Sequence, residues 1–176
     1  MLWIVIVVVA LLALLLVLAY NGLVAKRNRS QNAWAQVDVQ LRRRYDLIPN
    51  LVEAVKGYAA HERATFEEVT QARTAAQQAQ AENMLTAALG RLFAVAEAYP
   101  QLRATENFQQ LQGQLSEVEQ NIVVARQVYN DTVLTYDNAL ETVPTNIVAG
   151  LFNFSPRDYF ETEGATREAP SVQFSN

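Results

Sequence analysis

The sequence predicts an all-α protein. We expect a single N-terminal transmembrane helix that continues into an antiparallel bundle of three to four long helices, followed by an extended C-terminal tail. Three observations predict this fold. An uncharged apolar run opens the chain, apolar residues then recur at helical spacing over two long segments, and only five Pro and six Gly interrupt 176 residues. We therefore divide the chain into an anchor (residues 1–25), a helical bundle (26–143) and a tail (144–176).

The apolar run Leu2–Tyr20 is long enough to cross a membrane. As a helix it spans about 28 Å, close to the roughly 30 Å hydrocarbon core of a bilayer. A cleaved signal is the alternative, with Val17-Leu18-Ala19 as a poor cleavage motif. Signals carry a basic segment before an apolar core of about 7–15 residues. No Lys or Arg precedes this longer run, so we predict a permanent anchor.

The charges that flank the run predict its direction. Lys26, Arg27 and Arg29 follow it, and the first acidic residue is Asp38. Because Lys and Arg mark the cytoplasmic side, we expect the N-terminus outside and the bundle in the cytoplasm. Tyr20 fits an aromatic anchor at the interface. The basic cluster is either a topology signal alone or also a contact for anionic lipid headgroups.

From Ala33 to Val69 an apolar stripe recurs at steps of three and four or their sums. Its members are Trp34, Val37, Leu41, Ile48, Leu51, Val55, Tyr58 and Val69. The stripe keeps its phase across Pro49, which favours a kinked, nearly continuous helix over two separate ones. Nothing but Gly22 interrupts the chain before Ala33, so this helix can be the anchor's own continuation. Arg44 occupies a stripe position, and we expect its head to reach the surface while its stem packs.

The polar stretch 74–83 is a helix end or a loop, where we expect the chain to reverse. A second helix is predicted from Ala81 or Met84 to Ala98, ending at Tyr99-Pro100. The longest periodic segment runs from Leu102 to about Thr142, with Thr105 and Asn107 as plausible cap residues. Its stripe is Phe108, Leu111, Leu115, Val118, Ile122, Ala125, Tyr129, Thr132, Tyr136, Ala139 and Val143. Pro144 ends this helix, and no helical stripe follows.

The tail contains scattered aromatic residues, of which Phe152, Phe154 and Phe160 are candidate contact residues. We expect them to fix an extended tail on the bundle. The alternatives are that they contact a neighbouring subunit or the headgroup layer.

No residue pattern indicates an enzyme, a cofactor or a metal site. The chain has no Cys, and its single histidine, His61, has no HExxH partner. Phosphate-binding loops and nucleophile elbows are absent. The net charge of −4 argues against nucleic-acid binding. The run Arg42-Arg43-Arg44 wraps around its helix, so pairing with Asp38 or Asp46 competes with a role in contacting a partner or lipid.

Three segments resemble the LemA family. They are YNGLVAKRNRSQNAWAQVDVQLRRRYDLIPNLVEAVKGYAAHE (20–62), GRLFAVAEAYPQLRATENFQQLQGQLSEVEQNIVVARQVYN (90–130) and the pattern around NFSPRDYFE (153–161). The resemblance implies a bacterial membrane protein with a short outside N-terminus and a cytoplasmic helical bundle. It supplies no catalytic residues.

We expect a non-enzymatic scaffold that self-associates on membrane lipid at the inner face of the cytoplasmic membrane, where it organises or shapes that membrane. On the long helix, Val128, Val133 and Leu140 broaden the apolar face beyond what two shorter helices cover. The alternative is an adaptor that binds another membrane protein, a protease or sensor in envelope stress, through its tail.

Overall fold

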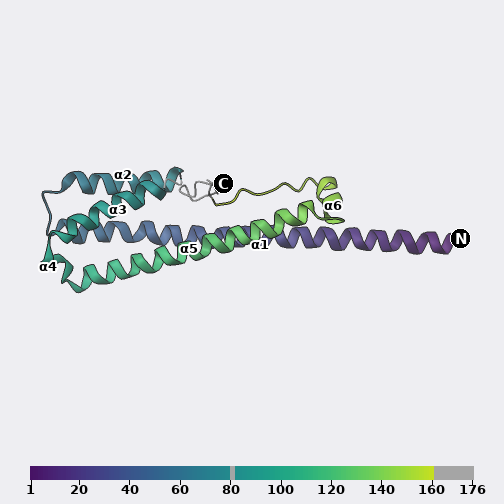
Figure 1. The fold of residues 1–176 in the computed structure, drawn as a ribbon, viewed down its shortest axis with the longest axis horizontal. Coiled ribbons are helices and arrows are strands. Elements are labelled where there is room, and N and C mark those ends of the chain that lie inside the picture. The colour runs from purple at the N-terminus through teal and green to yellow at the C-terminus, as the bar shows by residue number, and fades with distance from the viewer. Residues whose placement is uncertain (80–81, 161–176) are drawn as a thin grey trace, which may run out of the picture.

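The protein is a long helical rod in the computed structural model, which describes residues 1–79 and 82–160. The described elements are α1 (Leu2–Lys56), α2 (Arg63–Ala79), α3 (Glu82–Glu97), α4 (Pro100–Arg103), α5 (Glu106–Glu141) and α6 (Thr145–Leu151). Figure 1 shows α5 antiparallel to α1, with the α2–α3 hairpin on the half of α1 far from the N-terminus. The described residues contain no strand, and the all-α prediction is confirmed.

The helix α1 joins the apolar run to the bundle without a break. Its 55 residues extend about 82 Å. Residues 2–18 are all exposed, whereas residues 23–56 bury one stripe. Gly22 and Pro49 lie inside the helix, both on exposed positions. The predicted continuity through both residues is therefore confirmed.

Pro49 is tolerated because another helix supplies the donor that it lacks. A proline has no N–H, so the carbonyl four residues earlier, on Tyr45, loses its helical partner. Arg73 from α2 fills this position, and its Nε donates to the Tyr45 carbonyl at 2.8 Å. The helix hairpin thus replaces the backbone hydrogen bond that Pro49 removes from α1.

The predicted extension of this helix to Val69 is wrong. The helix α1 ends at Lys56, and a turn over 57–62 leads into α2. Tyr58, a predicted stripe residue, lies in that turn and is exposed, while Ala59 is buried in its place. The chain therefore reverses twice, first in this turn and again in the predicted region 74–83. There α2 ends at Ala79 and α3 begins at Glu82.

The core lies between α1 and α5 and extends to the hairpin. The predicted stripe of α5 is buried from Phe108 through Tyr136, with Ala125 and Thr132 partly exposed and Val133 fully buried. Val143 is the exception, since α5 ends at Glu141 and Val143 is exposed. Thr105 does occupy the N-cap of α5, but its Oγ1 donates to the Leu102 carbonyl. Asn107, the other cap candidate, is wrong, because it lies inside the first turn of α5.

The segment after Pro144 differs from the extended conformation predicted for it. Residues 145–151 form α6, which packs Val148 and Ala149 against Leu23 of α1. Asn153 then takes a left-handed conformation, with φ of 54°, and the Phe154 amide donates to the Ala149 carbonyl at 3.0 Å. This helix-ending geometry turns the chain back along the bundle. From there to Phe160 the tail forms no helix or strand and runs as an extended trace along the bundle, as predicted (Figure 1).

Candidate membrane and assembly surfaces

The described residues hold no group of three or more His, Asp or Glu side chains close enough to bind a metal ion. His61 lies exposed in the turn between α1 and α2. The bundle instead contains a buried polar cluster around Arg44, and it exposes several large apolar side chains.

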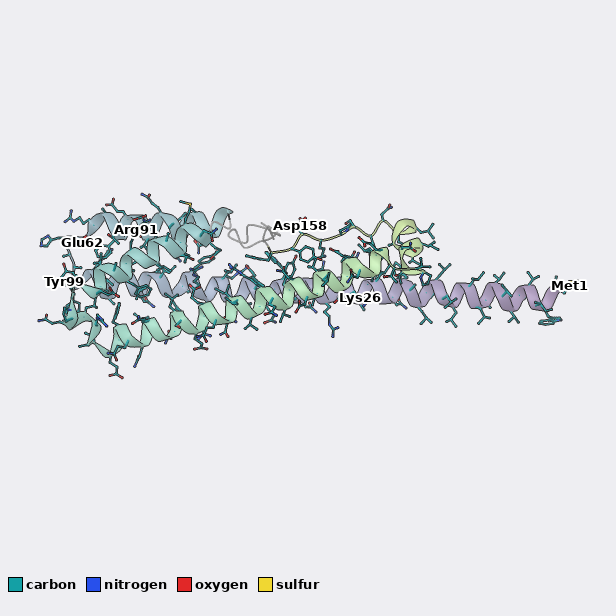
Figure 2. All side chains as sticks on the ribbon, in the orientation of Figure 1. Met1, Lys26, Glu62, Arg91, Tyr99 and Asp158 are labelled. Atoms are coloured by element: carbon teal, nitrogen blue, oxygen red, sulfur yellow. The ribbon has the colours of Figure 1, made fainter. Side chains whose placement is uncertain are left out.

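Among the described residues, α1 is the one helix that is long and apolar enough to span a membrane. Its apolar part lies near the N-terminus. Figure 2 shows carbon side chains from Met1 toward Lys26, while nitrogen and oxygen atoms appear on the rest of the rod as far as Glu62 and Tyr99. In water this exposure is unfavourable, at about 25 cal/mol for each Å² of apolar surface. A lipid environment removes that cost, so the apolar segment is a candidate membrane span.

The four predicted interface residues lie where α1 leaves this apolar segment. The ring of Tyr20 contacts those of Phe152 and Phe154, at centroid distances of 4.8 and 5.7 Å. The guanidinium of Arg27 lies 5.3 Å from the Phe154 ring centroid, and Lys26 is likewise partly buried. Arg29 is exposed. The structure therefore brings Tyr20 and Arg27 together with the start of the tail, a contact that spacing alone did not indicate.

The three consecutive arginines have three different environments. Arg42 pairs with Asp38 at 2.8 Å on the surface of α1, as predicted. Arg43 reaches Glu117 of α5 at 3.9 Å, across the seam between the two long helices. Arg44 is only 2% exposed, so the expectation that its head reaches the surface is wrong.

Arg44 is buried because acceptors from two helices surround its guanidinium. Its Nη1 donates to Glu82 at 2.6 Å, and its Nη2 donates to Thr86 at 2.8 Å. Its Nε lies 2.9 Å from a carboxylate oxygen of Glu119, close enough for an ion pair. The Tyr45 hydroxyl donates to the second oxygen of Glu82. A buried charge is tolerated when such partners replace water, so this cluster fixes how α1, α3 and α5 fit together.

The cluster also shifts the pKa values of its neighbours. Burial, together with the hydrogen bond to Glu82, raises the pKa of the Tyr45 hydroxyl above its usual range. Burial lowers the pKa of Arg126, against the opposing attraction of Glu82. Arg126 lies against the tail, where its guanidinium carbon is 4.2 Å from the Phe160 ring centroid. Arg44 is the one exception in the predicted stripe, but its partner Glu82 lies 38 residues away and no local pattern links the two.

The described part of the tail is held on α5 by side chains that bond to its backbone. Tyr136 donates to the Ser155 carbonyl at 3.1 Å, and Tyr129 donates to the Asp158 carbonyl at 2.8 Å. The Asn130 amide bonds both backbone groups of Phe160, at 2.8 and 3.2 Å. Burial raises the pKa of both tyrosines. These contacts agree with the prediction that the tail is fixed on the bundle.

The three candidate aromatic residues of the tail divide into two kinds. Phe154 packs on Tyr20 and Arg27, and Phe160 packs on Trp34 at a centroid distance of 5.8 Å. Phe152 touches Tyr20 but keeps 57% of its surface exposed. Only Phe152 presents most of its surface outward.

The long helix α5 also exposes large apolar side chains away from its buried stripe. They are Val123, Val124, Val128 and Leu134, each about half exposed or more. We call these four residues the outer valine strip. Val39 of α1 is exposed as well, at 55%. Of the residues expected to broaden the face, Val128 is in the strip, Val133 is buried and Leu140 is partly buried.

The profile of the LemA family matches residues 33–174, which is most of the chain. The chain belongs to the LemA family. Its similar proteins include two from Paramagnetospirillum magneticum (strain ATCC 700264 / AMB-1), named magnetosome proteins MamQ 2 and MamQ 1. Each is 27% identical over 90% of this chain and 70% of its own length. Magnetosome protein MamQ of Magnetospirillum gryphiswaldense (strain DSM 6361 / JCM 21280 / NBRC 15271 / MSR-1) is 24% identical over 85% and 67%. This LemA-family chain is thus a membrane-associated helical protein related to MamQ.

Proposed function

We propose that this LemA-family protein is a non-enzymatic, membrane-anchored scaffold that self-associates and thereby organises or shapes the membrane that carries it. The observation that carries the proposal is the outer valine strip. No described segment of the chain covers it, although the tail covers another face of the same helix. A second copy of the chain is the occupant that we assign to it.

The anchor makes weak self-contacts effective. Tethering confines all copies to one surface and in one orientation, which raises their effective concentration. The helix α1 is continuous from the apolar segment to the bundle, so neighbouring copies present the strip at the same height. The names of the relatives, which are magnetosome proteins, support a role in building a cellular structure.

Lys26, Arg27 and Arg29 support the cytoplasmic side of the membrane as the location of the bundle, by the same charge argument as before. The adaptor alternative receives less support. Phe154 and Phe160, two of the aromatic residues proposed to bind a partner, are occupied by side chains of the same chain.

The test is the particle size of the full-length protein in mild detergent and in lipid nanodiscs, measured by light scattering. We expect an oligomer for the parent protein and a shift to the monomer for the double variant Val124→Glu/Val128→Glu. The matched control is Gln71→Glu/Gln77→Glu, which adds the same charge to exposed positions of α2 and should leave the oligomer intact. A parent protein that is monomeric in both environments contradicts the proposal.

A further inference from the structure

The helix α6 lies at the end of the bundle that faces the apolar segment of α1. Its buried residues Val148 and Ala149 pack on Leu23, with Ala19 beside them. Figure 1 shows α6 next to α1 at the point where the remainder of α1 extends alone toward the N-terminus. This short helix is therefore the part of the bundle nearest the membrane.

The opposite side of α6 is apolar and uncovered. Ile147 and Leu151 are four residues apart, so they share one face of the helix, and they are 58% and 67% exposed. Val143 precedes them and Phe152 follows them, both also exposed. We call these four residues the α6 lip.

The chain around the lip contains no charge. Residues 142–156 include no Asp, Glu, Lys or Arg, although charged residues flank the stretch at Glu141 and Arg157. Exposed apolar side chains on a water-facing loop are normally interspersed with charged ones. A stretch that lacks charge and exposes four large apolar side chains is suited to lipid.

The position of the lip identifies its occupant. Phe152 contacts Tyr20, the last residue of the apolar run, at a centroid distance of 4.8 Å. One turn nearer the N-terminus, Leu16 and Val17 are exposed on α1 and require lipid around them. The lip thus continues an apolar surface that already enters the membrane.

We propose that α6 inserts Ile147, Leu151 and Phe152 into the interfacial layer of the bilayer, as a second and shallow membrane contact beside the span. Two contacts at different positions around α1 restrict the tilt of the rod, whereas a single span leaves it free to tilt. Arg27, which packs on Phe154 at the bundle side of the lip, then lies at the level of the headgroups. This contact does not depend on self-association and goes beyond the proposed scaffold function.

The chain has no Cys, so a single Cys reports one position. We would label Ile147→Cys and Leu151→Cys with an environment-sensitive fluorophore and reconstitute the full-length protein in phosphatidylcholine–phosphatidylglycerol vesicles. The vesicles carry phosphatidylcholine with a nitroxide either high or deep on its acyl chain. Leu12→Cys marks the span, and Val124→Cys is the exposed apolar control on the distant bundle. Phe152→Cys replaces any lip variant whose circular dichroism differs from that of the parent.

We expect the lip labels to lose fluorescence to the high nitroxide more than to the deep one, with the reverse order for Leu12→Cys and no loss for Val124→Cys. Lip labels that behave like Val124→Cys overturn the proposal. So does lip emission that escapes the nitroxides and shifts when unlabelled protein dilutes the labelled copies, because that result assigns the lip to a second copy. Quenched lip labels on a monomeric protein would sink the scaffold function and leave this membrane contact standing.

Discussion

The two halves of α1 belong to one helix but differ in how their apolar residues are distributed around it. From residue 2 to 18 every side chain is apolar and exposed, with no preferred face. From Ser30 to Val55 a buried stripe recurs every three or four positions, and the charged residues other than Arg44 lie outside it. A helix that is apolar on all sides requires lipid, whereas a striped helix requires partner helices. The difference predicts that the environment of α1 changes near Tyr20 while its backbone stays helical.

The largest effect is expected from a charge placed in the core of the bundle half, which depends on buried apolar contacts. Ile122 is 2% exposed on α5, and Ile122→Asp buries a carboxylate without a partner. We expect a loss of more than about 4 kcal/mol in the free energy of unfolding, measured by chemical denaturation in detergent. The matched variant Gln114→Asp, at an exposed position of the same helix outside the outer valine strip, should cost less than about 1 kcal/mol. Equal losses in the two variants would show that the assigned core face of α5 is wrong.

The buried ion pair of the bundle half should be nearly as sensitive. Glu82→Ala leaves the Arg44 guanidinium buried without its main partner and should cost about 3–5 kcal/mol. The double variant Arg44→Met/Glu82→Leu removes both charges and should recover most of that loss, as followed by thermal unfolding. A double variant as unstable as Glu82→Ala would indicate that the charges themselves hold the helices together.

A charge in the membrane half should act on a different quantity. Leu12→Arg is expected to cost about 2.5–3.5 kcal/mol of membrane insertion. Because residue 12 contacts no part of the bundle, thermal unfolding of the bundle should not change. Flotation of reconstituted vesicles measures the first effect and circular dichroism the second. Loss of the bundle's unfolding transition would contradict the independence of the two halves.

Arg73 provides a smaller test within the bundle half. Arg73→Met removes the donor to the Tyr45 carbonyl and should cost about 1–3 kcal/mol. In a Pro49→Ala background the helix regains its own amide donor, so the same change should cost less. The four variants form a double-mutant cycle whose coupling term is read from chemical denaturation. Additive effects would show that Arg73 does not compensate for Pro49.

The smallest expected effect is a dependence on alkaline pH. The pKa of Tyr45 is raised in the folded protein, so its hydroxyl holds its proton more tightly there than in the unfolded chain. That stabilisation is present below the pKa of an unfolded tyrosine, about 10, and declines as the pH rises above it. Above about pH 10, the free energy of unfolding of Tyr45→Phe should therefore fall less steeply with pH than that of the parent protein. If the two proteins have the same pH profile, Tyr45 loses its proton as easily in the folded bundle as in the unfolded chain.

Periodicity predicted most of this fold because helices bury residues at a fixed spacing. It identified the apolar run, the α5 stripe and the ends of α3, all of which depend on neighbours in the chain. The turn after Lys56 was missed because Tyr58 falls three residues after Val55 and continues the phase of the stripe. Seven residues are too few to show a period, so α6 was missed as well.

The surfaces were harder to predict than the helices. Tyr20 and Arg27 were recognised as interface residues from the run and its charges, but their contacts with Phe152 and Phe154 come from the other end of the chain. The burial of Arg44 depends on Glu82 and Glu119 in two other helices. Contacts of this kind join residues far apart in sequence, and a single sequence carries no local sign of them.

The central claim is that one rigid helix connects the membrane to the bundle. Spin labels at Leu12→Cys and Val39→Cys, both exposed, test it in full-length protein reconstituted in lipid with an excess of unlabelled copies, so that only distances within one chain are measured. A continuous helix over these 27 residue steps predicts a single narrow distance distribution near about 40 Å between the labelled backbone positions, measured by pulsed electron paramagnetic resonance. A broad distribution, or a clearly shorter mean distance, would show a flexible or bent joint and contradict the claim.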